Sequence, residues 1–477
     1  MLIPSIRRPL MAALMLSSAL ALGACVSVPH LPTAAQIKPA QSYAAAQSLT
    51  APAADWPKDA WWKAYGDGQL GALIDEALAN APDLAAAEAR VRKAQAYAEQ
   101  AGATRLPEID ANAGVGVAKQ SYNMGFPPAY VPHGWKSEGQ GALDFTYEFD
   151  FWGKNRATLS AATSAAEAAA ADAAAARLTL STSIAAAYAD LARLYADRDA
   201  AVDAVRVRSQ SLDLIGQRQG QGLENQSAVD RAHAGRAAAE ADLAAVDESI
   251  GLTRDRIAAL MGEGPDRGLA IQPPPASAIK PFGLPRTLQA DLIGRRPDVV
   301  AARLRAEAAG QRIKAAKAEF YPNVNLSAAI GLQSLGLDTL VKAGSIYGSL
   351  GPALSLPIFS AGRLQGAYRV SRADYDEAVA DYDAALTQAL QDVADVAVSE
   401  RALDLRLAKS REALDASQSA WRMANDRYRG GLATYLDVLT AEDALIANSR
   451  AVADLQTRAF ALDIALTRAL GGGFQST

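Results

Sequence analysis

Cysteine and histidine are scarce in this 477-residue sequence, which contains one cysteine and three histidines. A single thiol excludes a disulfide within the chain, so packing has to stabilise the fold. The histidines, His30, His133 and His233, are isolated, and none has a second ligand at metal-binding spacing. The sequence also lacks a G-x-S-x-G motif, a phosphate-binding glycine loop and an H-E-x-x-H motif. We therefore expect no metal site, no catalytic residues and no enzyme activity.

A surplus of positive charge is also missing, because 52 acidic residues stand against 47 basic ones. Nucleic-acid binding needs a basic face, so this balance argues against a nucleic-acid partner. After the N-terminal segment, no apolar run reaches the roughly 20 residues that a helix needs to cross a bilayer. If the protein spans a membrane, the sequence predicts that it does so as a closed β-barrel.

The N-terminal segment has the features of a secretory signal. Arg7 and Arg8 precede the apolar run Leu10–Leu22, which is too short to span a membrane. The run ends in Leu-Gly-Ala-Cys, which is similar to a bacterial lipobox, and we predict removal of residues 1–24 and lipid attachment at Cys25. This covalent lipid is the only added group that we expect. The alternative is a stray cysteine beside an ordinary cleavage site.

The remaining sequence contains two tandem copies of one pattern. Asn80–Leu84 recurs as Arg295–Val299, and Leu106–Ile109 recurs as Tyr321–Val324. We predict a lipidated linker at 25–60, a first repeat at 61–262, a Pro-rich connector at 263–285, a second repeat at 286–470 and a tail at 471–477.

Each copy begins with an alanine-rich amphipathic helix, 83–105 or 297–319, which a proline then ends. Strict alternation of apolar and polar residues follows, predicting strands at about 107–120, 139–152, 322–334 and 346–360, each with one apolar and one polar face. The strands have the length of tilted membrane strands, and the aromatics at 147–152 and 320–321 would form an interfacial girdle. The alternative is a soluble hairpin with one half-buried face.

Two very long stretches without proline, 154–219 and 362–428, predict helices of about 100 Å. Each ends at a glycine turn and returns as a helix, 228–260 or 434–470. Apolar residues between 384 and 397 recur at the 3/4 spacing of a coiled-coil seam. A soluble coiled-coil rod would not explain the attached hairpins. The acids Asp190, Asp197 and Asp203 are interpreted as solvated or lumen-lining residues without a shared site.

Several segments together resemble the TolC-like outer-membrane efflux proteins, specifically the NodT-type lipoprotein branch. They are Trp61–Asp67, Ile293–Val299, Glu319–Val324, Leu356–Arg363 and Arg427–Leu439. The resemblance implies a mainly α fold with a membrane β-barrel part, in which three protomers each give four strands to a twelve-stranded barrel above a long periplasmic α-helical barrel. Four strands alone cannot close a barrel, which also predicts partner chains.

The resemblance implies a passive exit duct for drugs, toxic small molecules or metal ions, in a tripartite (RND-type) efflux pump. Its expected partners are two further copies, a periplasmic adaptor, an inner-membrane transporter and outer-membrane lipid. The chain is expected in the outer membrane, lipid-anchored and extending into the periplasm. Two alternatives stay open: an outer-membrane channel for type I protein secretion, and a pore-less structural coiled-coil lipoprotein.

The resemblance also implies a periplasmic gate after the second glycine turn, formed by Asp437, Leu436, Thr440 and Tyr428. Thr440 stands where the best-known pattern has a second acid. The acid that would pair with Tyr428 falls at Ala228, which argues against that bond. The alternative for Asp437 is a surface acid near a helix N-terminus, which the helix dipole favours.

Overall fold

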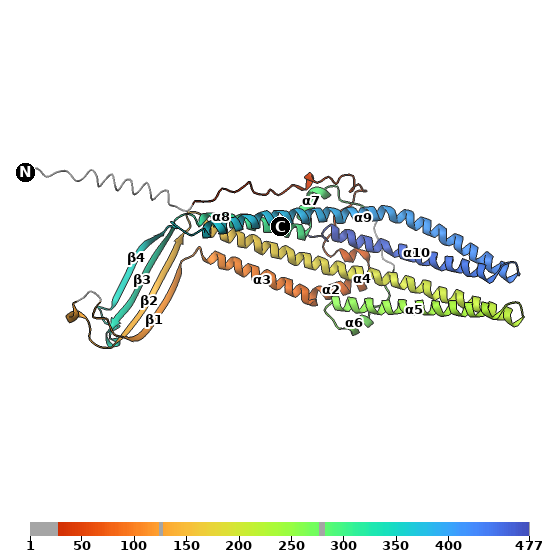
Figure 1. The fold of residues 1–477 in the computed structure, drawn as a ribbon, viewed down its shortest axis with the longest axis horizontal. Helices are drawn as coiled ribbons and strands as arrows, with labels where there is room; N and C mark the ends of the chain where they lie inside the picture. The colour runs from red at the N-terminus through yellow and green to blue at the C-terminus, as the bar shows by residue number, and fades with distance from the viewer. Residues whose placement is uncertain (1–26, 124–126, 276–281, 477) are drawn as a thin grey trace, which may run out of the picture. The chain divides into compact units, whose positions relative to one another are not determined.

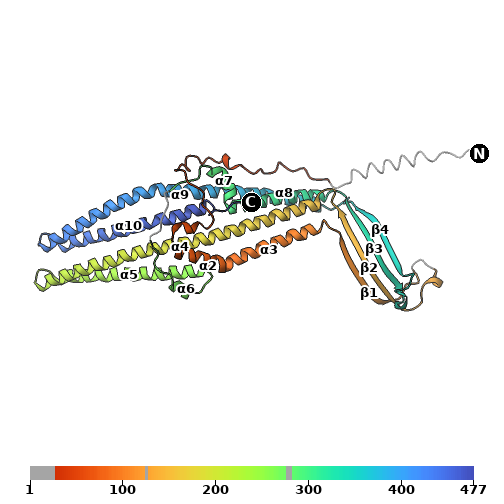
Figure 2. The same ribbon diagram turned by 180° about the vertical axis from the view of Figure 1, so that it is seen from behind.

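The computed structural model describes residues 27–123, 127–275 and 282–476, and the chain forms two compact units. The first unit contains Arg92–Ala168, Arg303–Asp381 and the described part of Met1–Gln36. The second contains the described residues of Ile37–Val91, Ala169–Ala302 and Tyr382–Thr477. Each unit therefore combines segments from both halves of the sequence, as the colours in Figures 1 and 2 show.

A four-stranded antiparallel sheet dominates the first unit. Its strands, β1 (Glu108–Ala118), β2 (Lys136–Phe149), β3 (Asn323–Leu335) and β4 (Ile346–Ser355), lie side by side in sequence order (Figure 1). Two strands differ from the prediction by three residues or more, β2 at both ends and β4 at one; β2 ends at Phe149 instead of near 152. β2 begins at Lys136 instead of near 139, because Lys136 still pairs with Ala118. β4 ends at Ser355 instead of near 360, two residues before Pro357, which has no N–H for the ladder.

The strand register separates the apolar residues from the polar ones. Ile109 pairs with Phe145, Phe145 with Ala328 and Ala328 with Leu350, and directly paired residues share a face. On the opposite face the Asn112 amide donates to Asp144 Oδ2 at 2.7 Å. The predicted alternation is confirmed. The apolar face is open over all four strands, with Ile109 67%, Leu143 52%, Ile330 62% and Leu350 75% exposed.

Aromatic side chains gather at one end of this sheet. Trp152 stacks on Tyr321 with ring centroids 4.7 Å apart, and its indole N–H donates to the Pro322 carbonyl at 2.8 Å. Phe149 stacks on Phe151. Rings from both sequence repeats therefore lie at the same end of the sheet, as the sequence predicts for an interfacial girdle.

The chain's long helices are α4 (Lys154–Gly220) and α9 (Arg363–Arg429), each of 67 residues. In the second unit they turn back as α5 (Gln226–Leu260) and α10 (Tyr435–Ala469), as predicted. Both turns need a left-handed residue, supplied by Gly222 (φ 73°) and Gly431 (φ 74°). Among the described helices, none is both long enough and apolar enough for a membrane span.

Shorter helices complete the two units. They are α2 (Gly68–Asn80), α3 (Pro82–Ala103), α6 (Pro265–Leu269), α7 (Leu288–Arg295) and α8 (Pro297–Ala318). The described residues also form the 3₁₀ turns Ala40–Ser42 (η1), Trp61–Tyr65 (η2), Pro128–Tyr130 (η3) and Leu337–Thr339 (η4). Pro82 and Pro297 are the first residues of α3 and α8, where their missing N–H costs no hydrogen bond.

The largest core of the second unit joins η2 and α2 to the long helices. Tyr65 packs edge-on against Phe460 of α10 with ring centroids 5.0 Å apart. The hydroxyl of the buried Tyr188 on α4 donates to Asp67 at 2.8 Å, and the Asp67 carboxylate also accepts from the first N–H groups of α2. One side of the α4 and α10 helices is therefore covered by the segment that precedes the first long helix.

Candidate functional site

The predicted site residues divide into two groups. Cys25, the predicted lipid-attachment residue, lies outside the described residues. Asp437, Leu436, Thr440 and Tyr428 all lie in the second unit, at or close to the turn between α9 and α10.

Asp437 closes a capping box at the start of α10. Its carboxylate Oδ2 accepts hydrogen bonds from the Thr434 hydroxyl and from the Thr434 backbone N–H, both at 2.8 Å. These two bonds lower the pKa of Asp437, in that order of importance. The carboxylate therefore has the local role that an acid at a helix N-terminus usually has. The gate role stays a prediction for this residue.

Leu436 and Thr440 flank Asp437 on the same helix. The Leu436 side chain is 68% exposed. The Thr440 hydroxyl donates to the Leu436 carbonyl at 2.9 Å, so it bonds within its own helix. An isolated chain therefore presents an uncovered leucine beside an ionised aspartate at the start of α10.

Tyr428 has an acidic partner, and the expectation based on Ala228 is wrong. The Tyr428 hydroxyl donates to Glu224 Oε1 at 2.8 Å, while Ala228 packs beside the tyrosine in one apolar cluster. Arg218 lies over the ring at 4.5 Å and donates to the Tyr428 carbonyl at 3.0 Å. Burial, together with the neighbouring Glu224 carboxylate, raises the pKa of Tyr428, so its hydroxyl remains a donor. The acid precedes α5 in the turn, instead of lying within the helix.

A buried ion pair joins α4 to α10 closer to the middle of the hairpins. Arg208 Nη1 lies 2.7 Å from Glu442 Oε2, and Glu442 is completely buried. Arg208 also pairs with Asp443, and the Ser211 hydroxyl donates to Glu442 Oε1. Burial raises the pKa of Glu442, and the bonds from Ser211 and Arg208 oppose that rise. Removing one partner of such a pair leaves the other charge buried and unpaired, which strongly destabilises the fold.

Sequence reasoning missed this pair, although one signal was present. Glu442 follows Tyr435 and Val438 at the i, i+3, i+7 spacing of the buried side of α10. An acid on an apolar stripe requires a buried partner. The sequence does not show that the partner is Arg208, which lies 234 residues earlier.

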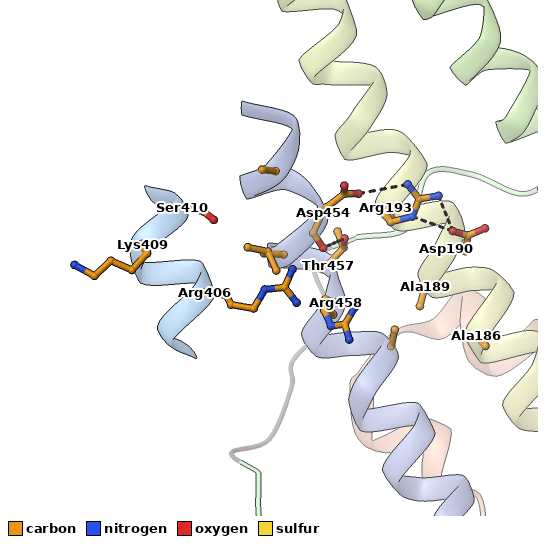
Figure 3. A pocket seen from close by; sticks show the side chains of 13 residues that line it. Ala186, Ala189, Asp190, Arg193, Arg406, Lys409, Ser410, Asp454, Thr457 and Arg458 are labelled. Atoms are coloured by element: carbon orange, nitrogen blue, oxygen red, sulfur yellow. Dashed lines mark hydrogen bonds and ion pairs between the residues drawn. The ribbon is translucent and has the colours of Figure 1, made fainter. Parts of the chain in front are cut away.

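Arg193 on α4 forms ion pairs with two acids of its own helix and one of α10. It contacts Asp190 at 2.9 Å, Asp197 at 2.6 Å and Asp454 of α10 at 3.4 Å. The interpretation of Asp190 and Asp197 as acids without a shared site is therefore wrong. Asp203 pairs separately with Arg206 at 3.1 Å. Beside the Arg193 cluster a cleft of about 640 Å³ opens between α4, α9 and α10 (Figure 3).

Within the three described ranges, no group of three potential ligands is placed to hold a metal ion. His133 instead packs against Tyr122, with ring centroids 5.0 Å apart.

The family model described as "Outer membrane efflux protein" matches residues 73–263 and 288–472. The chain belongs to this family. Its members' fold is TolC-like, and family and fold are those of outer-membrane channels. The structure of the outer membrane protein VceC from Vibrio cholerae is 47% identical in sequence, with a TM-score of 0.84. That match covers 88% of this chain and 100% of VceC.

Two curated relatives show how far the similarity extends. The pyoverdine export outer membrane protein OpmQ of Pseudomonas putida is 31% identical, over 97% of each chain. The fusaric acid resistance protein FusA of Burkholderia cepacia is 36% identical over 65% of this chain, but the match spans only 59% of FusA. The likeness to OpmQ and VceC therefore extends over most of the chain, and localisation is to the outer membrane.

Proposed function

We propose that this protein is the passive exit duct of a tripartite efflux pump, through which small molecules cross the outer membrane. The observation that carries this proposal is the apolar sheet face, which is continuous over four strands and uncovered in the single chain. Burying such a face in lipid is favourable, while the opposite polar face would contact water in a bore. The named relatives export pyoverdine or confer fusaric acid resistance, which supports small molecules as cargo.

Planar-bilayer conductance of the purified full-length protein distinguishes this function from its alternatives. A duct gives discrete conductance steps, whereas a pore-less coiled-coil lipoprotein gives none. Crosslinking in cells then separates efflux from secretion. We expect an adaptor and a transporter of small molecules to co-purify. Recovery of a polypeptide exporter with its protein cargo would favour type I secretion instead.

The duct is proposed to be a homotrimer. β1 and β4 are the edges of the sheet, and exposed edges with unpaired N–H and C=O groups need partners. Three copies of the four-stranded sheet would supply twelve strands. Native mass spectrometry of the detergent-purified chain should show a trimer. A stable folded monomer would contradict this assembly.

The membrane anchor is proposed to be an acylated Cys25. Several acyl chains on one terminus give stable attachment where a single chain is marginal. Mass spectrometry of the mature N-terminus should show a lipid-modified cysteine at this position. An intact signal peptide or a free thiol there would overturn the proposal.

The gate is proposed to lie at the hairpin tips, with Asp437 and Leu436 from three copies around one axis. Like carboxylates held close together attract cations, so the ring would favour cations and bind divalent ions. Asp437→Ala is expected to weaken cation selectivity and divalent block. Thr434→Ala removes part of the cap but keeps the carboxylate, so it should preserve both properties. Equal loss in the two variants would assign Asp437 a capping role alone.

A further inference from the structure

The cleft in the second unit contains two arginines whose side chains have no partner in the described part of the chain. The side chains of Arg406 on α9 and Arg458 on α10 make no hydrogen bond or ion pair with any described residue. Figure 3 shows both side chains directed toward the same open space. The other bases of the cleft are engaged: Arg193 pairs with three aspartates, and Lys409 lies 2.7 Å from Glu412.

Besides its four bases, the cleft is lined by the polar residues Asp190, Ser410, Asp454 and Thr457 and by apolar ones. Its lining includes Ala186, Ala189, Ala451, Leu455 and Ala461, and its volume of about 640 Å³ lies within the range of small-molecule sites. Guanidinium groups bind carboxylates through paired N–H donors. Apolar side chains beside two such groups suit a molecule with a flat apolar body and an acidic end, whose body contacts the alanines and Leu455.

The cleft opens on the side of the helices that η2 and α2 leave uncovered. On α4, Tyr188 and Leu191 belong to the covered side. The cleft residues Asp190 and Arg193 lie two positions after Tyr188 and Leu191, respectively. On α10, Arg458 precedes the covered Phe460 by two positions. Two positions correspond to a rotation of about 200°, almost the opposite side of the helix. In a hollow duct, η2 and α2 could not cover the inner side of the wall without filling the bore. The side that they cover is therefore the outer one, and the uncovered side with the cleft is the inner one.

We infer that this cleft is a binding site for amphiphilic organic anions in the wall of the bore, with Arg406 and Arg458 holding the acidic group. The inference rests on the proposed duct function and names one class of cargo beside the cations that the Asp437 ring would favour. Exposed arginines give weak binding, and weak binding is what a conduit needs, since a tightly held cargo would not leave.

Calorimetry with 2-naphthoate, an aromatic carboxylate, tests this inference on the full-length detergent-purified protein. The uncharged 2-naphthamide serves as the matched probe. We expect the Kd for naphthoate to rise at least tenfold in Arg406→Gln/Arg458→Gln. Arg256→Gln/Arg411→Gln removes the same charge from exposed positions of α5 and α9 outside the cleft, and its Kd should stay within twofold of the unmodified protein.

Any of three binding results would overturn the inference: absent naphthoate binding, equal binding by both double variants, or equally tight binding of naphthamide. A loss of trimer in Arg406→Gln/Arg458→Gln by native mass spectrometry would also do so, because the arginines would then belong to a contact between copies. Conductance is recorded on the same samples. Normal conductance without binding rejects only the anion site, whereas absent conductance of the unmodified protein rejects the duct itself.

Discussion

Glu442 links α4 to α10 through a single buried carboxylate. Its replacement by alanine leaves Arg208 with one exposed partner, Asp443, in a site that was fully paired. We expect the free energy of opening in this part of α10 to fall by about 3 kcal/mol. Hydrogen exchange of the α10 amides measures this change.

A matched control for Glu442 is Glu412→Ala, which breaks the exposed pair with Lys409. Exposed pairs contribute about 1 kcal/mol or less, so exchange should hardly change. If Glu442→Ala and Glu412→Ala had the same small effect, the buried pair would not hold the two hairpins together.

Tyr428 and Tyr435 form a second matched pair at the tip. The Tyr428 hydroxyl bonds to Glu224, whereas the buried Tyr435 hydroxyl has no hydrogen-bond partner among the described residues. Tyr428→Phe should therefore lower the free energy of opening at the hairpin tips by about 1 kcal/mol. Tyr435→Phe should leave this free energy unchanged or raise it slightly. Hydrogen exchange around the two glycine turns is the measurement. Greater loosening by Tyr435→Phe would contradict these assignments.

Asp437 provides a pH prediction. Because its pKa is lowered, its carboxylate stays charged at a pH where an ordinary aspartate is protonated. Its capping contribution is present above the unfolded pKa and is lost as the pH falls through the lowered folded value. Thr434→Ala removes one of the two bonds, so divalent block should disappear at a higher pH than in the unmodified channel. Identical titration of the block in both proteins would mean that another group binds the divalent ion.

At the scale of elements, local patterns predict most of this fold. Period-two alternation places the strands, and proline-free stretches place the long helices, because both signals lie within the elements themselves. The ends of β2 and β4 depend on pairing with the neighbouring strand and on Pro357, so alternation alone misplaces them. Glu224 lies in a turn, where no periodicity marks it, so the sequence does not identify it as the partner of Tyr428.

The turn between α9 and α10 depends on Gly431. A side chain there meets no neighbour, but its φ of 74° is strained for any residue with a Cβ. Gly431→Ala should destabilise the hairpin by about 1 kcal/mol. Gly216→Ala, at an equally open position within α4, should stabilise its helix by up to about 1 kcal/mol. Chemical denaturation monitored by helical circular dichroism compares the two, and shifts of the same sign would contradict the argument.

At the scale of the whole molecule, ion pairs of the second unit join residues that are distant in the sequence. Arg208 and Glu442, or Arg193 and Asp454, come together only because the two repeats fold against each other in the second unit. A single sequence can mark one member of such a pair, as it does for Glu442 on the apolar stripe of α10, but it does not identify the partner. The sheet is different, because each repeat carries its own hairpin and one alternation sets both faces.

The central claim is that the polar face of the sheet lines a water-filled bore and the apolar face contacts lipid. Substituted-cysteine accessibility during planar-bilayer recording tests it most directly, because the chain's single native cysteine is the proposed lipid-modified Cys25. Ser327 and Ala328 are neighbours on β3 and project to opposite faces. A charged, water-soluble thiol reagent should reduce the current through Ser327→Cys and leave Ala328→Cys unchanged. Block of Ala328→Cys alone, or of neither variant, would contradict the account.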